Sequence, residues 1–415
     1  MRTQLRLSYA LALVFGALFV PNAPGDPPPA KPDWNLTALD QILATVPPGE
    51  RLAQIGDMQI LVSRLRVWRD QLAGTPTVQL AFDGLAPRWP GGKVFYAFSN
   101  NVSTAKQQAF LDGAQEWATF ANLEFIARST QANYILVVEN PNLGGGQSAV
   151  GMVGGAQWLQ LGPYAWNRGT ICHELGHALG LIHEHQRSDR DGFVTILTNN
   201  FIPGTEINFV RLPNSNNRGS YDFYSVMHYA RNTLSVNPAT LDTIRPLPAY
   251  SQFLNIMGGD NDTVLSAADR AGMAAVYGTG PLVTNRVTNT LDSGPGSLRA
   301  ALYFAYDHPG ATVAFNIPTS DPGFSNQVFN IQPTDILPTL ARGTTLDGAS
   351  QPTNTNPSGP AILLNGALAW TPSVYPQGLR LRGTNCTVRR LAINGFAANG
   401  LLLIRVAYRS YSLQK

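Results

Sequence analysis

Two histidines and a glutamate in the segment GTICHELGHALGLIHEHQRSDRD, residues 169–191, constrain this chain more than any other feature. His173 and His177 are four residues apart, so on a helix both imidazoles lie on one face, about one turn from each other. That spacing lets two neutral nitrogens reach a single cation. Glu174 follows the first histidine and can reach a water molecule at such a cation without being a ligand itself. The segment therefore predicts a helix that carries two ligands of a metal site.

A glycine and a third histidine extend the pattern. Gly180 permits the left-handed turn that ends a helix, and the chain can then bring His183 to the same cation. Three nitrogens with a position left open for water make up a catalytic zinc site rather than a closed structural one. The alternative is an amphipathic helix with incidental histidines. Five of the six histidines, however, lie in two short segments: His173, His177, His183, His185 and His228. That clustering favours a site for one Zn²⁺ ion.

The segment SYDFYSVMHYA, residues 220–230, agrees with this interpretation. The extended histidine motif predicts a methionine-containing turn downstream, where Met227 would form an apolar floor beneath the metal ligands. Tyr229 could present its phenol to the metal or to a developing oxyanion. Taken alone, Met227 would be interpreted as core packing.

Together these residues resemble the astacin family of metzincin zinc endopeptidases, over residues 88–278. Four further segments carry the resemblance: RWPGGKVFYAF, SAVGMVGGAQWLQL, HEHQRSDRD and LSAADRAGMAAVYG. The resemblance implies an α+β, metzincin-type zinc peptidase domain with a twisted mixed sheet and a long zinc-site helix. It also implies a zinc-dependent endopeptidase that hydrolyses peptide bonds in a protein or peptide substrate.

The resemblance also assigns roles to individual residues. It implies that the three histidines of the motif bind zinc and that Glu174 is the general base and acid for a metal-activated water. Tyr229 matches a fifth ligand that swings away to stabilise the tetrahedral intermediate. Glu184 matches the residue that pairs, through water, with the ammonium of the processed N-terminus; the alternative is a solvent-facing carboxylate. The family's catalytic domain usually carries disulfides, whereas here we interpret Cys172 as a small buried residue. A pair with Cys386 is the alternative.

The local patterns predict several elements in the peptidase domain. Alternating or continuous apolar runs predict strands over residues 93–98, 123–127, 134–138 and 157–161. A capping box formed by Thr104 and Gln107 predicts the start of a helix.

The N-terminus is typical of an export signal, which we assign to residues 1–23. Arg2 and Arg6 precede an apolar run over residues 7–20. Because a membrane span needs about 20 apolar residues, we expect no stable membrane insertion after signal cleavage. A signal-anchor is the alternative.

Residues 24–87 are predicted to be a pro-segment and linker with one helix over residues 60–72. Within it, Gly56-Asp57 resembles the family's pro-segment motif in which an aspartate caps the zinc, so Asp57 is a candidate latency switch. An ordinary turn is the alternative, since Gly-Asp is common in turns. Asp83 is a second candidate for the blocking carboxylate.

Residues 279–415 differ in character from the preceding domain. Short apolar runs separated by Asn-Gly and Asp-Gly turns predict a β-solenoid or sandwich, and Ser297 begins a short helix. The region resembles the opening of the right-handed parallel β-helices of bacterial surface proteins. This resemblance implies an all-β partial parallel β-helix that binds a surface glycan or serves as a stalk. Because a solenoid needs at least three stacked repeats, we predict that this region is incomplete.

Net charge and composition bear on the kind of partner and on the class of protein. A net charge of +3 is too small to indicate nucleic acid as a partner, and a charged fraction of 13% is typical of β-rich exported proteins. We therefore predict a secreted or cell-surface zinc endopeptidase, exported by a bacterial-type route and synthesised as a latent precursor. The alternative is a surface adhesin or glycan-binding protein with a vestigial peptidase domain. The intact motif favours the peptidase, because a decaying site should lose at least one functional residue.

Overall fold

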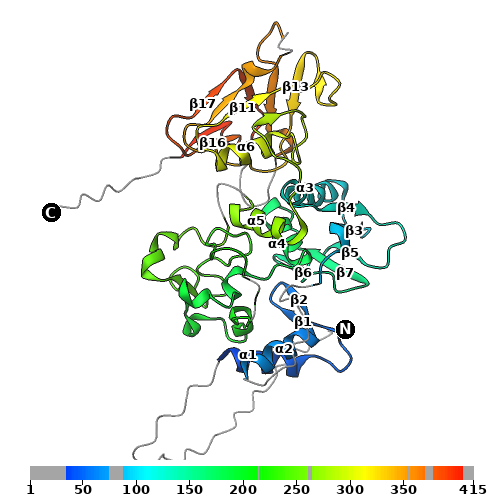
Figure 1. Cartoon of the computed structure of the whole chain (residues 1–415), viewed down its shortest axis with the longest axis vertical. Coiled ribbons are helices and arrows are strands. Elements are labelled where there is room, and N and C mark those ends of the chain that lie inside the picture. Colours follow the sequence, from blue (N-terminus) through cyan, green and yellow to red (C-terminus); the bar gives the residue numbers. More distant parts are fainter. Residues whose placement is uncertain are drawn as a thin grey trace, which may run out of the picture.

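The computed structural model describes residues 34–73, 87–213, 215, 217–259, 264–352, 356–369 and 377–404. These residues form an N-terminal segment, a central domain and a C-terminal β-rich region, which follow one another along the long axis of the molecule (Figure 1). The predicted export signal and the second candidate blocking residue, Asp83, lie outside the described residues. Among the described helices, none is long and apolar enough to cross a membrane.

The N-terminal segment consists of two helices and a β-hairpin. They are α1 (Trp34–Thr45), β1 (Leu52–Ile55), β2 (Met58–Leu61) and α2 (Val62–Leu72). The helix predicted over residues 60–72 begins two residues too early, because Ile60 and Leu61 pair with β1 as part of β2. The helix α1 and the strand β1 were not predicted. Buried side chains of this segment, among them Leu39, Met58 and Leu65, share one core with Val150 and Val210 of the central domain.

A seven-stranded mixed sheet, with the order β1-β2-β6-β7-β5-β3-β4, joins the N-terminal hairpin to the central domain. The strands of the central domain are β3 (Lys93–Phe98), β4 (Glu124–Ala127), β5 (Tyr134–Glu139), β6 (Gly146–Ala149) and β7 (Ala156–Leu161). The strands β4, β3, β5 and β7 are parallel, and β6 is antiparallel to β7. The predicted mixed sheet is therefore confirmed. The strand β2 pairs in parallel with β6.

Two helices, α3 (Thr104–Phe120) and α4 (Arg168–Ala178), pack on this sheet, and α5 (Ala267–Tyr277) packs against α3. The main core lies between α3, α4 and the sheet and includes Phe110, Trp117, Ile135 and Leu159. The predicted capping box at Thr104 is wrong by one residue. Ser103 is the N-cap, because its backbone is extended and its side chain accepts a hydrogen bond from the amide of Lys106. The zinc-site helix was expected to be long, but α4 has only 11 residues.

The part of the central domain that follows α4 is built mainly from loops and short helical turns. Its only described strands are β8 (Val194–Ile196) and β9 (Ile244–Pro246), and buried aromatic side chains form its core. The 3₁₀ helices of the chain are η1 (Pro90–Gly92), η2 (Glu184–Gln186), η3 (Arg190–Gly192), η4 (Thr198–Asn200), η5 (Glu206–Phe209), η6 (Pro248–Phe253), η7 (Gly348–Ser350) and η8 (Gly366–Leu368).

The C-terminal region contains one helix and ten short strands among its described residues. They are β10 (Arg286–Val287), α6 (Leu298–Asp307), β11 (Thr312–Phe315), β12 (Phe324–Ser325), β13 (Val328–Ile331), β14 (Thr345–Asp347), β15 (Ile362–Asn365), β16 (Leu379–Leu381), β17 (Thr387–Arg389), β18 (Leu391–Asn394) and β19 (Leu401–Leu403). Ser297 is the N-cap of α6, as predicted. This predicted helix is the exception to the otherwise β character that the family resemblance implies.

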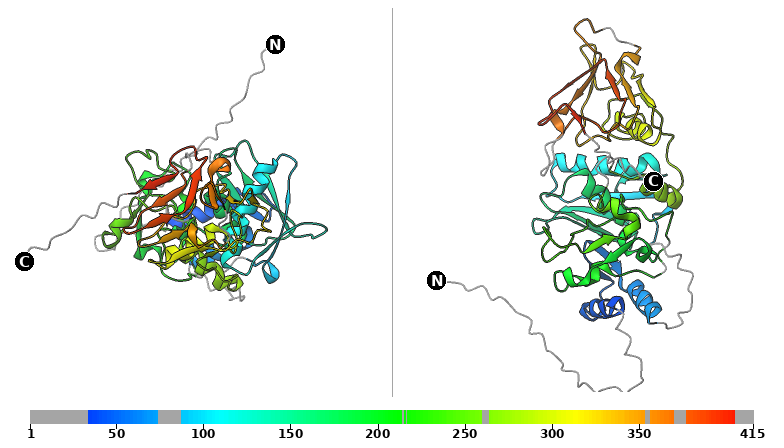
Figure 2. Two further views of the ribbon diagram at one scale, coloured as in Figure 1. Left: turned by 90° about the horizontal axis from the view of Figure 1, so that it is seen from above. Right: turned by 90° about the vertical axis from the view of Figure 1, so that its left-hand side faces the viewer.

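The strands of this region form three small sheets, with the orders β10-β11-β14-β17, β12-β13-β15-β18 and β16-β19. Every pairing is parallel except that of β12 with β13. Apolar side chains from the sheets and from α6 enclose a separate core. Figure 2 shows that α6 and its neighbouring loops lie next to α3 of the central domain.

Candidate metal centre

The helix α4 places the first two motif histidines side by side. Asn167 caps its first turn by accepting a hydrogen bond from the amide of Thr170. The i, i+4 spacing then brings the rings of His173 and His177 to a centroid distance of 4.7 Å, with their Nε2 atoms 3.1 Å apart. Both rings point away from the core side of the helix, where Cys172 is fully buried. Cys172 and Cys386 are both free, so the alternative of a disulfide between them is wrong.

The turn after α4 brings the third histidine to the same point. Gly180 has φ 111°, a left-handed conformation that is strained for residues with a side chain. The amide of Leu181 bonds back to the carbonyl of Gly176 and closes the turn. His183 then lies with its ring 5.3 Å from that of His173 and 4.8 Å from that of His177. The motif thus places the three imidazoles together as predicted.

Hydrogen bonds hold each imidazole by its Nδ1 atom. His173 Nδ1 lies 2.7 Å from the carbonyl of Val226, and His177 Nδ1 lies 2.9 Å from the carbonyl of Leu181. A carbonyl can only accept, so Nδ1 must carry the proton and Nε2 presents a free lone pair. His183 Nδ1 is held in the same way, 3.1 Å from Oε1 of Gln186. All three Nε2 atoms are therefore prepared as ligands that face one point.

A carboxylate from the N-terminal segment completes the cluster. Asp57, in the turn between β1 and β2, has Oδ2 3.2 Å from Nε2 of His173 and Oδ1 3.1 Å from Nε2 of His183. One ligand atom from each of the four side chains lies within 4.8 Å of the others. His183 Nε2 and Asp57 Oδ1 are buried, and neither makes a hydrogen bond within the described residues. Three imidazole nitrogens and a carboxylate oxygen, with two buried atoms left without hydrogen bonds, fit a zinc ion.

Glu174 lies beside the cluster in a tightly enclosed position. Its residue is 1% exposed, and its Oε2 atom has no hydrogen-bond partner in the described part of the chain. A β-carbon at Gly146, the first residue of β6, would lie 2.4 Å from Oε1 of Glu174, so glycine makes room for this carboxyl. Burial raises the pKa of Glu174 well above its ordinary value. A carboxyl with a raised pKa suits proton transfer near neutral pH.

Met227 and Tyr229 lie on two sides of the imidazoles. Met227 is buried against α4, where a β-carbon at Gly176 would stand 2.7 Å from its sulfur. The ring of Tyr229 lies 4.5 Å from the ring of His183. His185, whose role the sequence did not indicate, packs against Tyr229 at a ring distance of 4.2 Å.

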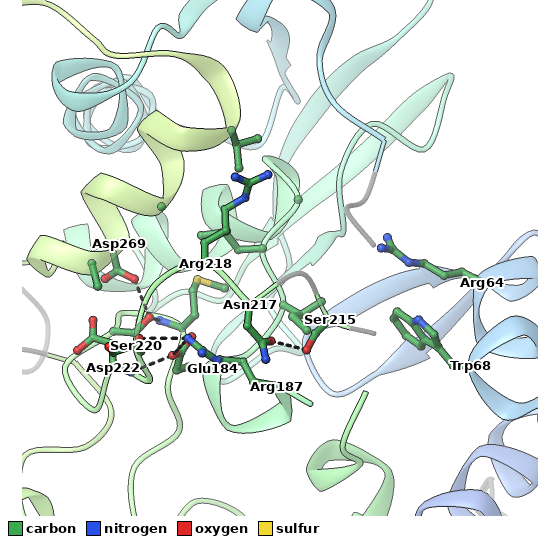
Figure 3. A pocket seen from close by; sticks show the side chains of 18 residues that line it. Arg64, Trp68, Glu184, Arg187, Ser215, Asn217, Arg218, Ser220, Asp222 and Asp269 are labelled. Atoms are coloured by element: carbon green, nitrogen blue, oxygen red, sulfur yellow. Dashed lines mark hydrogen bonds and ion pairs between the residues drawn. The ribbon is translucent and has the colours of Figure 1, made fainter. Parts of the chain in front are cut away.

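Glu184 is not solvent-facing, contrary to the alternative considered for it. It lines a pocket with Asp222, Asp269 and Arg187, while Trp68 of α2 lines the same pocket from the N-terminal segment (Figure 3). Burial raises the pKa of Glu184 to about 7, even though the guanidinium of Arg187 lies 2.8 Å away. Three carboxyls and three guanidinium groups, the latter from Arg64, Arg187 and Arg218, line the pocket, so it offers partners for ions of either sign.

Sequence reasoning missed the groups that hold the ligands in place. Val226 and Leu181 contribute only backbone carbonyls, which leave no signal in side-chain identity. Gln186 follows His183 at a spacing of three residues, a pattern that could have marked it as the partner of Nδ1. The role of Gly146, which leaves room for Glu174, depends on the packing of β6 against α4 and has no signal in the sequence.

This fold and cluster define the class of zinc-dependent metallopeptidases. Residues 83–278 match the family model described as Astacin (Peptidase family M12A), so this part of the chain is an astacin peptidase domain. The family is zinc-dependent, in agreement with the residues of the cluster. The matched range begins five residues before the predicted boundary at residue 88 and ends at the predicted boundary, residue 278.

Three comparisons describe the relatives of this domain. The chain is 38% identical to Tolloid-like protein 1 of Homo sapiens over 183 residues, which cover 41% of this chain and 18% of that protein. It is 33% identical to an astacin-like metalloendopeptidase of Coturnix japonica over 204 residues, covering 47% of this chain and 45% of that protein. Among solved structures, high choriolytic enzyme 1, a hatching enzyme zinc-protease of Oryzias latipes, is 30% identical with a TM-score of 0.42 and covers 46% of this chain and 92% of that one. The chain thus spans less than half the length of these two curated relatives.

Proposed function

We propose that this chain is an exported, zinc-dependent endopeptidase that is synthesised as a latent precursor. The observation that carries the proposal is the convergence of three Nδ1-anchored imidazoles, from His173, His177 and His183, on the carboxylate of Asp57. No structural role explains why three Nε2 atoms and a carboxylate should meet in a buried site. A shared metal ion does explain it, because it offsets the cost of burying these groups.

Each residue of the site then has a chemical task. Zinc, when bound, supplies a Lewis acid that polarises the peptide carbonyl and lowers the pKa of water. Glu174 takes the proton from the attacking water and passes it to the leaving amine. Tyr229, whose ring adjoins that of His183, donates a hydrogen bond from its phenol to the carbonyl oxygen as negative charge develops there. Met227 supports α4 from below and so fixes the first two ligands.

Latency follows from the position of the N-terminal hairpin. Asp57 occupies the side of the cluster that a reacting peptide would need. The strand β2 also covers the edge of β6, where the amides of Ser148 and Val150 bond to carbonyls of Asp57 and Gln59 at 2.8 and 2.9 Å. An extended substrate could not pair with this edge until the hairpin leaves. Both obstacles belong to one segment, so a single cleavage between the end of α2 and residue 88 would allow them to leave together.

The pocket beside Glu184 supplies a place for the new N-terminus. Arg88 bonds to the carbonyl of Val276, and Val276 lines the same pocket as Glu184. A cleavage near residue 88 would therefore create an ammonium close to this pocket. We propose that Glu184 then pairs with the ammonium, as expected from the family resemblance.

A comparison of three purified proteins tests the proposed activity. After removal of residues 1–87, the wild-type chain should hydrolyse a denatured protein substrate, a chelator should abolish this activity, and added Zn²⁺ should restore it. Glu174→Ala should be inactive, while the control Glu124→Ala, at an exposed position on β4, should match wild type. Equal inactivity of all three would instead favour a glycan-binding protein with a vestigial site.

We further propose the domain order of a signal over residues 1–23, a pro-segment to residue 87, the peptidase domain over 88–278, and a partial parallel β-helix from residue 279. Support for the β-helix comes from the in-register parallel stacking of β14 on β17, β15 on β18 and β16 on β19. Such stacks are typical of solenoid coils. A surface glycan is the proposed ligand. Binding of the inactive Glu174→Ala chain to immobilised polysaccharides would test this, and absence of binding to any of them would argue against it.

A further inference from the structure

We propose that Asp335 and Asp292, in the C-terminal region, are positioning residues for the metal centre because they hold the first turn of the zinc-site helix α4. The C-terminal region would then be part of the structure that maintains the metal site, rather than a separate module attached behind it. The inference rests on the proposed zinc site.

The first contact is with the backbone of α4. Oδ2 of Asp335 accepts a hydrogen bond from the amide of Arg168, the first residue of the helix, at 2.9 Å. This amide is one of the four that an α-helix leaves without an internal partner. The N-cap, Asn167, satisfies only the amide of Thr170. A carboxylate at a helix N-terminus also interacts favourably with the helix dipole. Asp335 therefore acts as a second cap, provided from more than 150 residues further along the chain.

The second contact is with the side chain of Arg168, which is only 3% exposed. Its guanidinium pairs with Asp292 from the C-terminal region and, at 3.3 Å, with Glu116 of α3. Thr334 bonds to both Asp292 and Asp112, so the carboxyls of the two regions share one buried network. A buried guanidinium that loses a carboxylate partner is strongly destabilised. Without Asp292, Arg168 would keep Glu116 as a partner but lose its ion pair with the C-terminal region, and we expect the start of α4 to shift.

Further contacts show that this network is the centre of a continuous interface. Arg299 of α6 pairs with Asp292 at 2.9 Å and lies 3.9 Å from Glu116. At another point, Arg270 of α5 makes two hydrogen bonds to Asp307, at 2.7 and 2.9 Å. Helices α3, α4 and α5 of the peptidase domain therefore each contribute a residue that contacts the C-terminal region.

A direct path connects this interface to the ligands. Arg168 precedes His173 by five residues and His177 by nine, so all three lie on the single helix α4. A helix transmits a shift of its first turn to the residues that follow. Outer contacts of metal ligands commonly change metal affinity 10- to 100-fold when they are removed. Asp335 contacts the helix that carries the ligands and not a ligand itself. We therefore expect its removal to weaken zinc affinity about tenfold, at the lower end of this range.

The test uses full-length chains with zinc affinity and hydrogen exchange as readouts. Asp335→Ala should weaken zinc binding about tenfold in competition with a chelator and should accelerate amide exchange in residues 168–178. Asp335→Asn keeps an oxygen that can accept from the amide of Arg168, so its zinc affinity should stay within about threefold of wild type. Asp292→Asn preserves the shape of the interface but removes charge, and should also weaken zinc binding. It serves as the second variant should Asp335→Ala fail to fold.

The matched control is Asp347→Ala. Asp347 pairs with Arg389 within the C-terminal sheets, so its loss perturbs that region without touching α4. The inference is overturned if Asp335→Ala and Asp292→Asn both bind zinc as tightly as wild type and show wild-type rates of amide hydrogen exchange in α4. An equal effect of Asp347→Ala would also overturn it, because the role of the interface would then be general stability. A wild-type chain that binds no zinc would instead contradict the proposed function.

Discussion

Oδ1 of Asp57 lies 3.1 Å from Nε2 of His183, and this contact joins the tip of the N-terminal hairpin to the third histidine of the metal cluster. The aspartate reaches this position because β2 adds a strand to the edge of β6. The same pairing places Asp57 over the imidazoles and closes the sheet edge beside them. The hairpin therefore both places a carboxylate at the imidazoles and covers the neighbouring edge of the sheet.

Replacing Asp57 by alanine should give a precursor with measurable peptidase activity. The cluster loses its fourth ligand while β2 still covers β6, so we expect at least a tenfold rise over the wild-type precursor but less activity than the processed enzyme. Initial rates on a short peptide substrate would measure it. Asp40→Ala is the control, since Asp40 lies in the same segment and pairs with Arg69 of α2 rather than with the imidazoles. An inert Asp57→Ala precursor would contradict the proposed latency.

Gly56→Ala should loosen the hairpin and make the precursor easier to activate. Gly56 has φ 60°, and a β-carbon there would lie 2.2 Å from Oδ1 of Asn208 and 3.1 Å from the phenol oxygen of Tyr229. Strain of this kind costs on the order of 1–3 kcal/mol. Limited proteolysis should cleave the variant precursor several-fold faster. Gly49→Ala separates the two causes, because Gly49 has φ 90° but nothing within 4 Å of the added carbon. Equal effects of both changes would rule out the contact as the reason.

Tyr229→Phe should lower kcat of the processed enzyme about 100-fold and change KM little. Removal of one hydrogen-bond donor to a developing oxyanion commonly has an effect of this size. The zinc content of the variant should equal that of wild type. Tyr250→Phe should be fully active, because the ring of Tyr250 packs against Phe193 and Phe223 rather than against an imidazole of the cluster. A rise in KM at unchanged kcat would assign Tyr229 to substrate binding instead.

The pH dependence of stability should report on the buried contact of Asp292. Burial alone would raise its pKa, but Arg168 and Arg299 more than offset this and lower the pKa to about 2. The stabilisation of the folded state by ionised Asp292 is therefore present above pH 4 and is lost as the pH falls toward 2. The difference in unfolding free energy between wild type and Asp292→Asn should shrink by about 2 kcal/mol between pH 5 and pH 2. Urea titrations at both values would measure it, and a constant difference would show that Asp292 does not titrate with a lowered pKa.

The metal cluster was largely predictable from the sequence because its ligands are close along the chain. The i, i+4 spacing, the turn at Gly180 and the third histidine specify the arrangement through local geometry alone. Four strands (β3, β4, β5 and β7) and the start of α6 were also predicted to within one residue, because each has a clear local pattern. The N-cap at Ser103 was missed by one residue because two neighbouring hydroxyl residues can both cap a helix.

The remaining features depend on contacts between distant segments. A periodicity argument assigned Ile60 and Leu61 to a helix, whereas their pairing with β1 makes them part of a strand. No pattern around Asp292 or Asp335 indicated a partner, because each meets Arg168 only through the docking of the two regions. Family resemblance singled out Asp57, but only the β2–β6 pairing explains why its carboxylate reaches the imidazoles.

Elemental analysis of the purified full-length precursor tests the central claim most directly. The three imidazoles share one ion, so wild-type protein should contain one zinc per chain, and His183→Ala, which removes the ligand after the turn, should retain far less after dialysis. His228→Ala is the matched control, because His228 bonds to Tyr221 and does not belong to the cluster. One zinc per chain in wild type and in the control, with loss in His183→Ala, is the predicted result. Folded wild-type protein without zinc, or equal zinc in all three proteins, would contradict the account.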